Sequence, residues 1–190
     1  MAVVLIEGFD HFDGSNMGEK GWIGSSFQSF VPGRGFVGGN CIMLIFANPV
    51  SKVLPSSYSH LIVGCAFRKH LYNGTFMTLK AGSSVVATLG TTSASRLVVT
   101  DQAANTAVGS TIIHDDVFNY VELEIVVSTS GSCELHLNGN PSAEIPSTVR
   151  NFGSTNIDTI QFECDSIGDA RTWIDDLYII DTTGSAPQND

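Results

Sequence analysis

The sequence predicts an all-β protein, an antiparallel β-sandwich with little helix. Apolar runs of four to eight residues recur along the 190-residue chain, and turn-forming clusters separate them. The 19 glycines supply many tight turns, and no window keeps a sustained apolar stripe of helical period. The length suits one core, so we expect a single domain over residues 1–181 and an extended tail over 182–190.

About 12 strands are expected, at the spacing of 8–12 residues between turns that is typical of sandwiches and barrels. They cover 3–7, 27–31, 41–46, 61–68, 75–80, 85–89, 96–100, 110–114, 120–127, 133–138, 158–163 and 172–180. At most one turn of helix is expected, near residues 16–20.

The clearest pairing is an antiparallel hairpin between residues 120–127 and 133–138. Both segments alternate apolar and polar side chains, and Gly131 in the connection is expected to supply a positive φ. The outward polar side chains would be Glu122, Glu124, Glu134 and His136. We interpret them as a solvated surface, because alternating glutamates are routine on an outer face. A glycosidase would need two carboxylates in a cleft, and no second motif supports one here.

Two adjacent carboxylates, Asp175 and Asp176, interrupt the apolar run at 172–180. Consecutive strand residues point to opposite faces, so the two carboxylates are not expected to enter one cleft. Each face is mostly apolar, so at least one of them should be desolvated and should need hydrogen-bond donors or a cation. Backbone N–H groups would suffice, which makes a structural role adequate.

A structural cation is the alternative that stays open beside the Asp175–Asp176 pair. The segment "EGFDHFDGSN" offers oxygen ligands whose spacing is not that of an EF-hand. They are Glu7, Asp10, Asp13 and Asn16. Asp10 would pair with Asp175 or Asp176, but ordinary turn chemistry also explains the segment. We therefore assign no metal ligands.

Charge and hydropathy exclude two classes of partner. The net charge of −10, without any cluster of lysine or arginine, argues against nucleic acid. No apolar run approaches the roughly 18 residues of a membrane span. The four cysteines lie in or beside apolar runs and are best read as buried thiols of a protein made in a reducing cytosol, although disulfides stay open. They are Cys41, Cys65, Cys133 and Cys164.

No catalytic or cofactor-binding residue is assigned. The histidines are scattered, at His11, His60, His70, His114 and His136. "HDD" at 114–116 fits a polar turn, and "GRGFVGGN" at 33–40 lacks the ending of a phosphate loop. Glycan binding stays open through aromatic side chains, if they are exposed: Trp22, Tyr58, Tyr72, Tyr120 and Tyr178. Trp173 is mid-strand and is expected in the core.

Three segments carry a resemblance to a known group of proteins. They are "IEGFDHF" with "KGW", "VFNYVELEIVV" with "GSCELHLNGNP", and "WIDDLYIIDTTGSAPQND". In this order they resemble virion proteins of tailed bacteriophages with a jelly-roll domain of the laminin-G and concanavalin A type. The resemblance implies an antiparallel jelly roll in a virion particle, and it carries over no active site.

On this basis we expect a non-catalytic structural protein of a phage virion, assembled in the host cytoplasm. The first choice is an oligomeric decoration (cement) protein on the capsid exterior, whose main partner is the major capsid protein, with tail proteins as the alternative. Residues Met1–Val4 and Thr182–Asp190 would reach neighbouring subunits. One alternative is a tail or fibre module that binds a host-surface glycan. The other is a glycoside hydrolase.

Overall fold

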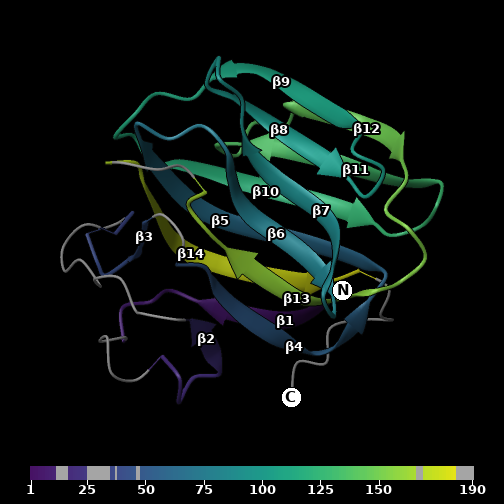
Figure 1. Cartoon of the computed structure of the whole chain (residues 1–190), viewed down its shortest axis with the longest axis horizontal. Coiled ribbons are helices and arrows are strands. Elements are labelled where there is room, and N and C mark those ends of the chain that lie inside the picture. Colours follow the sequence, from purple (N-terminus) through teal and green to yellow (C-terminus); the bar gives the residue numbers. More distant parts are fainter. Residues whose placement is uncertain (12–16, 25–34, 37, 46–47, 166–168, 183–190) are drawn as a thin grey trace.

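Two seven-stranded antiparallel sheets lie face to face in the computed structural model (Figure 1). It describes residues 1–11, 17–24, 35–36, 38–45, 48–165 and 169–182. Sheet A runs in the order β1 (Ala2–Glu7), β14 (Arg171–Asp181), β5 (His60–His70), β10 (Asn119–Val126), β11 (Gly131–Leu137) and β12 (Ile145–Arg150), and β3 (Ile42–Ile45) also pairs with β14. Sheet B runs in the order β2 (Trp22–Gly24), β4 (Val50–Tyr58), β13 (Ile157–Phe162), β6 (Thr75–Ala81), β7 (Ser84–Thr91), β8 (Arg96–Asp101) and β9 (Thr106–Ile112).

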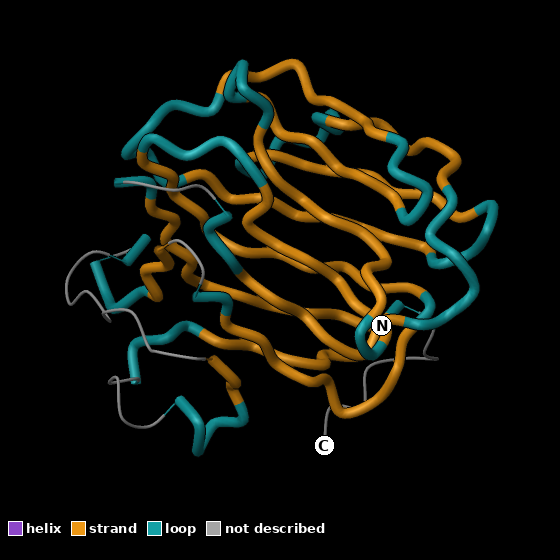
Figure 2. The backbone as a smooth tube through the Cα atoms, in the orientation of Figure 1, coloured by secondary structure: helices purple, strands orange, loops and turns teal. Residues whose placement is uncertain are grey.

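The predicted all-β sandwich is confirmed: the described residues contain 14 strands and only loops between them (Figure 2). The expected strand at 27–31 and part of the expected helical turn lie outside the described residues, and residues 17–21 form a hydrogen-bonded turn. No helix in the described part of the chain is long and apolar enough to cross a membrane.

Three strands escaped the sequence analysis, β2, β4 and β12. β4 and β12 were missed because Pro55 and Pro146 lower the strand propensity of their segments. In β4 the pairing with β13 is irregular, so that residues 54–57 lie opposite Asp158 alone and Pro55 disturbs no regular ladder. Pro146 lies in β12, at the end of sheet A, where a missing N–H is tolerated.

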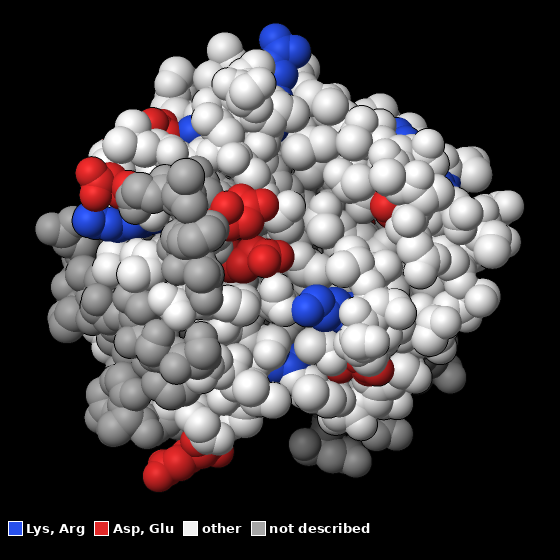
Figure 3. Space-filling view, in the orientation of Figure 1, with Lys and Arg blue, Asp and Glu red and all other residues white. Residues whose placement is uncertain are grey.

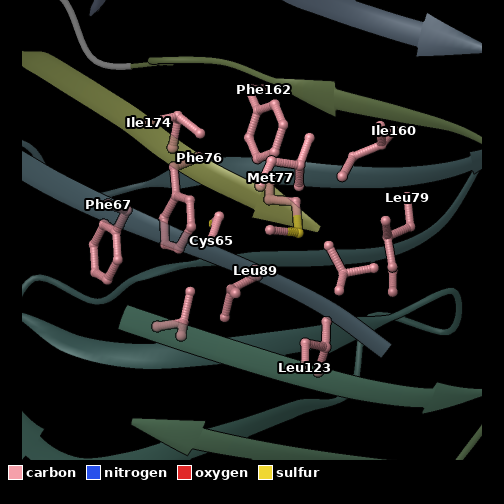
Figure 4. Close-up of a cluster of buried hydrophobic side chains, with 14 of the residues drawn as sticks. Cys65, Phe67, Phe76, Met77, Leu79, Leu89, Leu123, Ile160, Phe162 and Ile174 are labelled. Carbon is pink, nitrogen blue, oxygen red and sulfur yellow. The ribbon is translucent and has the colours of Figure 1, made fainter. Parts of the chain in front are cut away.

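The core lies between the two sheets, and in strands such as β10 and β11 alternate residues form it. Figure 4 shows side chains of both sheets meeting there, among them Phe67 of β5 and Phe76 of β6. These two rings stack with centroids 4.4 Å apart and an interplanar angle of 7°. All four cysteines are buried and none of them forms a disulfide, which confirms their interpretation as buried thiols.

The predicted hairpin is confirmed, since β10 pairs with β11 from Val121 opposite Leu137 to Val126 opposite Ser132. The expected role of Gly131 is wrong, because it is not among the residues with positive φ. A Cβ atom there would lie 2.0 Å from the carbonyl oxygen of Val126, so the position needs glycine for a close backbone approach. Positive φ occurs instead in the turn after β11, at Asn138 and Gly139.

Candidate functional site

A row of four residues crosses the outer face of sheet A. The strand register places Tyr178 of β14 opposite Gly64 of β5, Gly64 opposite Glu122 of β10, and Glu122 opposite His136 of β11. Their neighbours along each strand belong to the buried core, so the side chains of the row point away from it. We call these four residues the sheet A row.

Within the sheet A row, Tyr178 leans across the strand that separates it from Glu122. A Cβ atom on Gly64 would lie 2.2 Å from the Cε1 atom of Tyr178, so the ring occupies the space that a side chain on β5 would fill. The Tyr178 hydroxyl donates a hydrogen bond to Oε2 of Glu122. Burial, followed by this interaction with the carboxylate, raises the pKa of Tyr178, so the phenol remains a proton donor.

His136 is held at the other end of the row by two acceptors. Its Nδ1 lies 3.0 Å from the carbonyl oxygen of Asn140, and its Nε2 lies 2.7 Å from Oε1 of Glu134. An imidazole can donate from both nitrogens only when it is protonated. The Asn140 carbonyl, and then the Glu134 carboxylate, therefore raise the pKa of His136 above its ordinary value.

Tyr120 lies between two cavities beside this row. Its ring centroid is 6.3 Å from that of Tyr178, with an interplanar angle of 24°. A cavity of about 380 Å³ extends from both rings towards Glu7 and Asp176. A second cavity, of about 260 Å³, extends from Tyr120 across Glu122 and His136. Burial raises the pKa of Tyr120 to about 12. The two tyrosines thus form an aromatic ridge along a groove.

The Asp175–Asp176 pair does not divide between opposite faces, so that expectation is wrong. Ile174 and Leu177, on either side of the pair, both belong to the buried core. The pairing of β14 with β5 shifts between Asp175 and Tyr178, which inserts a bulge, and Asp176 has a φ of +46°. Both carboxylates therefore lie on the outer side of the sheet, and an extra strand residue is the physical reason.

Asp175 is buried and accepts hydrogen bonds from backbone N–H groups, as expected for a structural carboxylate. It is 3% exposed and accepts hydrogen bonds from the backbone N–H groups of Phe36 (2.8 Å) and Asp176 (2.9 Å). Burial nevertheless raises its pKa to about 6, against these bonds. The described part of the glycine-rich segment supplies one of these two donors, the N–H group of Phe36. A Cβ atom on Gly35 would lie 2.6 Å from Oδ2 of Asp175, which leaves no room for a side chain.

The same segment also contacts Asp10. The backbone N–H of Asn40 donates to Oδ1 of Asp10 over 2.8 Å, and a Cβ atom on Gly39 would lie 1.8 Å from that oxygen. Within the described residues, no three His, Cys, Asp or Glu side chains are grouped to hold a metal ion. Asp13 and Asn16, two of the oxygen ligands considered for a cation, lie outside the described residues.

The "HDD" segment forms the expected polar turn, and the structure shows what it pairs with. Asp115 lies 2.5 Å from Nζ of Lys69, and Asp116 lies 3.3 Å from Arg68 and 2.8 Å from Nδ1 of His70. The cations at one end of β5 are thus neutralised by this turn. Figure 3 shows acidic and basic side chains scattered over one face of the molecule, without a basic patch.

The aromatic candidates divide by exposure. Trp22 and Tyr72 are 2% and 1% exposed, so neither offers a stacking surface. Trp173 is buried as expected, but it lies outside the main core cluster, and the Arg68 guanidinium sits 4.2 Å from its ring centroid. Tyr120 and Tyr178 are half-buried with accessible edges in the groove.

Alternation correctly placed Glu122, Glu134 and His136 on an outer face. It gave no sign that Tyr178 reaches Glu122 across β5. One signal was present: Gly64 interrupts an otherwise apolar strand, and a glycine there marks the close approach of another group.

No protein-family model and no curated protein matches the chain. Solved structures, in contrast, include proteins of similar fold. Alginate lyase Aly36B has a TM-score of 0.58 at 11% identity, over 94% of this chain and 96% of that one. An endo-β-1,4-glucuronan lyase from the fungus Trichoderma reesei has a TM-score of 0.58 at 10% identity, over 95% and 96%. A botulinum neurotoxin type C structure, concerned with its interaction with two ganglioside molecules, has a TM-score of 0.51 at 18% identity, over 74% and 38%.

These similarities confirm the jelly-roll β-sandwich. The expectation of a non-catalytic capsid decoration protein is wrong, because the similar structures are polysaccharide lyases and a toxin that interacts with gangliosides. No finding shows a phage origin or virion partners. The capsid expectation rested on the resemblance carried by three sequence segments, and the similar structures do not support it.

The position of Tyr178 depends on the absence of a side chain at Gly64, and a double-mutant cycle tests this. We expect Gly64→Ala to destabilise the protein by about 1–3 kcal/mol through overpacking, measured by urea denaturation. In a Tyr178→Ala background the same substitution should be neutral or stabilising, since alanine suits a strand at least as well as glycine. An equal cost in both backgrounds would show that the Tyr178 ring does not occupy this space.

The raised pKa of Asp175 makes a pH-dependent contribution to stability. The folded protein favours the neutral carboxyl, so this contribution is fully present below the unfolded pKa of about 3.9 and is lost as pH rises through about 6. Asp175→Asn cannot ionise. We expect the free energy of unfolding of this variant to rise, relative to the unaltered protein, by about 2 kcal/mol between pH 4 and pH 7. A difference that stays constant over this range would contradict the assignment.

Proposed function

We propose that the protein binds a carbohydrate chain in the groove on the outer face of sheet A. The observation that carries this proposal is the Tyr120–Tyr178 ridge, with a cavity on each side and ring centroids 6.3 Å apart. A sugar ring presents an apolar C–H face and a rim of hydroxyl groups. An aromatic surface bordered by a few fixed polar groups matches both.

The polar border of the ridge contains acceptors and donors in fixed positions. Glu122 is held by the Tyr178 hydroxyl, and His136 is held between Asn140 and Glu134. Each side chain is therefore oriented before a ligand arrives, which lowers the entropy lost on binding. The similarity to structures of polysaccharide lyases and of a toxin that interacts with gangliosides supports a role with glycans.

Cleavage of the bound glycan is the second candidate function, and the Tyr178–Glu122–His136 arrangement favours it. A protonated phenol, a carboxylate and an imidazole in one row include groups that can donate a proton and groups that can accept one. If the row is catalytic, purified protein will release new reducing ends from a polysaccharide panel, and Glu122→Gln will abolish the release with folding intact. Binding without any release would restrict the function to recognition.

The ridge should dominate binding, because a central aromatic side chain is the usual energetic anchor of a recognition site. We expect Tyr120→Ala to weaken binding of a hit from an oligosaccharide array by about tenfold or more, measured by isothermal titration calorimetry. The matched control is Tyr58→Ala in β4 of sheet B, which lines neither cavity and should leave affinity unchanged. Unchanged affinity in the Tyr120 variant would place the site elsewhere.

A further inference from the structure

We propose that the groove selects glycans by charge, binding sugars with a free ammonium group most tightly, neutral sugars less tightly and uronates least. This inference rests on the proposed glycan site and names its ligand class. The alginate and glucuronan lyases share the fold, and their names refer to polymers of uronic acids. The charge of the groove argues for the opposite preference in this chain.

Carboxylates surround the tyrosine ridge. The larger cavity is bordered by Glu7 and Asp176, and the smaller one by Glu122. Glu134 lines neither cavity but lies two residues from His136 on the same face of β11. No lysine or arginine is among the described residues that line the two cavities. A carboxylate on a sugar would therefore face several fixed negative charges at short range.

The histidine that lines the groove already contacts two acceptors. His136 contacts Glu134 at 2.7 Å and the Asn140 carbonyl at 3.0 Å, which leaves neither ring nitrogen for a ligand carboxylate. On the neighbouring stretch of the face, Nε2 of His60 lies 2.7 Å from Oε1 of Glu124. His136 therefore offers no free ring nitrogen to an anion in the groove.

The cations of β5 are also held away from the groove. Arg68 lies over the rings of Trp173 and Phe118, at 4.2 Å and 5.9 Å from the centroids, and contacts Asp116. Lys69 is 2% exposed and pairs with Asp115. Neither side chain lines a cavity. The 115–116 turn therefore neutralises the positive charge of Arg68 and Lys69 at the end of β5.

A free ammonium group near Glu122 would meet a carboxylate with unused acceptor capacity. Only Oε2 of Glu122 receives the Tyr178 hydroxyl, and an ionised carboxylate has about four lone-pair sites. One unit charge at about 4 Å in water changes the interaction by about a factor of five in affinity, and more in a partly desolvated groove. The affinity should fall by one such step from a sugar with an ammonium group to a neutral sugar, and by another from the neutral sugar to one with a carboxylate.

The experiment compares three oligosaccharides of one length with the same β-1,4-linked glucose backbone. Their repeating units are glucosamine with its amino group protonated, glucose, and glucuronic acid. Calorimetric titration of the full chain at low salt should rank the affinities in that order, each step about fivefold or more. Added salt should compress the ranking, because it screens charge.

Two variants connect the ranking to the groove. Glu122→Gln and Asp176→Asn, which each remove a carboxylate that lines a cavity, should each reduce the preference for glucosamine over glucuronic acid by about fivefold. Glu19→Gln, an exposed glutamate outside the cavities, is the matched control and should leave the preference unchanged. Because the readout is a ratio within one variant, a general loss of affinity does not imitate the effect.

Two negative outcomes are distinct. If the glucose oligomer binds, loses affinity in Tyr120→Ala, and yet the glucuronic acid oligomer binds as tightly or more tightly, charge selection is wrong while the glycan site stands. The same conclusion follows if both groove variants keep the original preference. If none of the three oligosaccharides binds and an oligosaccharide array gives no signal, the proposed function fails and the selectivity fails with it.

Discussion

The contact between Tyr178 and the bare backbone of Gly64 is the constraint on which the candidate site depends. A side chain on β5 at this point would keep the side chains of Tyr178 and Glu122 apart, because the Tyr178 ring lies where a Cβ atom would be. Glycine permits the phenol to reach Glu122 across an intervening strand. The missing methyl group therefore lets side chains of β14 and β10 meet across β5.

The bulge in β14 contributes to the same arrangement. It places one extra residue between the inward side chains of Ile174 and Leu177, so that Asp175 and Asp176 both lie on the outer side. Asp175 then accepts a hydrogen bond from the backbone N–H group of Phe36 and lies close to Gly35. Asp176 borders the larger cavity. A buried core of alternating residues holds the sheet in place, and local irregularities on the opposite side shape the groove.

The sequence was sufficient for the all-β class and for most of the strands, because that information is periodic. Alternation over residues 120–127 and 133–138 defined the hairpin and its inward face, and apolar runs bounded by turns located most other strands. The bulge at Asp175–Asp176 could not be predicted, because a single inserted residue changes no propensity and is fixed by the pairing with β5. The partnership of Tyr178 with Glu122 depends on the order of strands across the sheet, which local patterns do not encode.

The central claim is that a sugar ring stacks on the Tyr120–Tyr178 ridge of sheet A. A crystal structure of the protein in complex with an oligosaccharide that it binds tests this claim most directly. We expect density for a pyranose ring against Tyr120, with a hydroxyl or amino substituent within hydrogen-bonding distance of Glu122. Density for the same oligosaccharide over sheet B, with the ridge still open to solvent, would contradict the account.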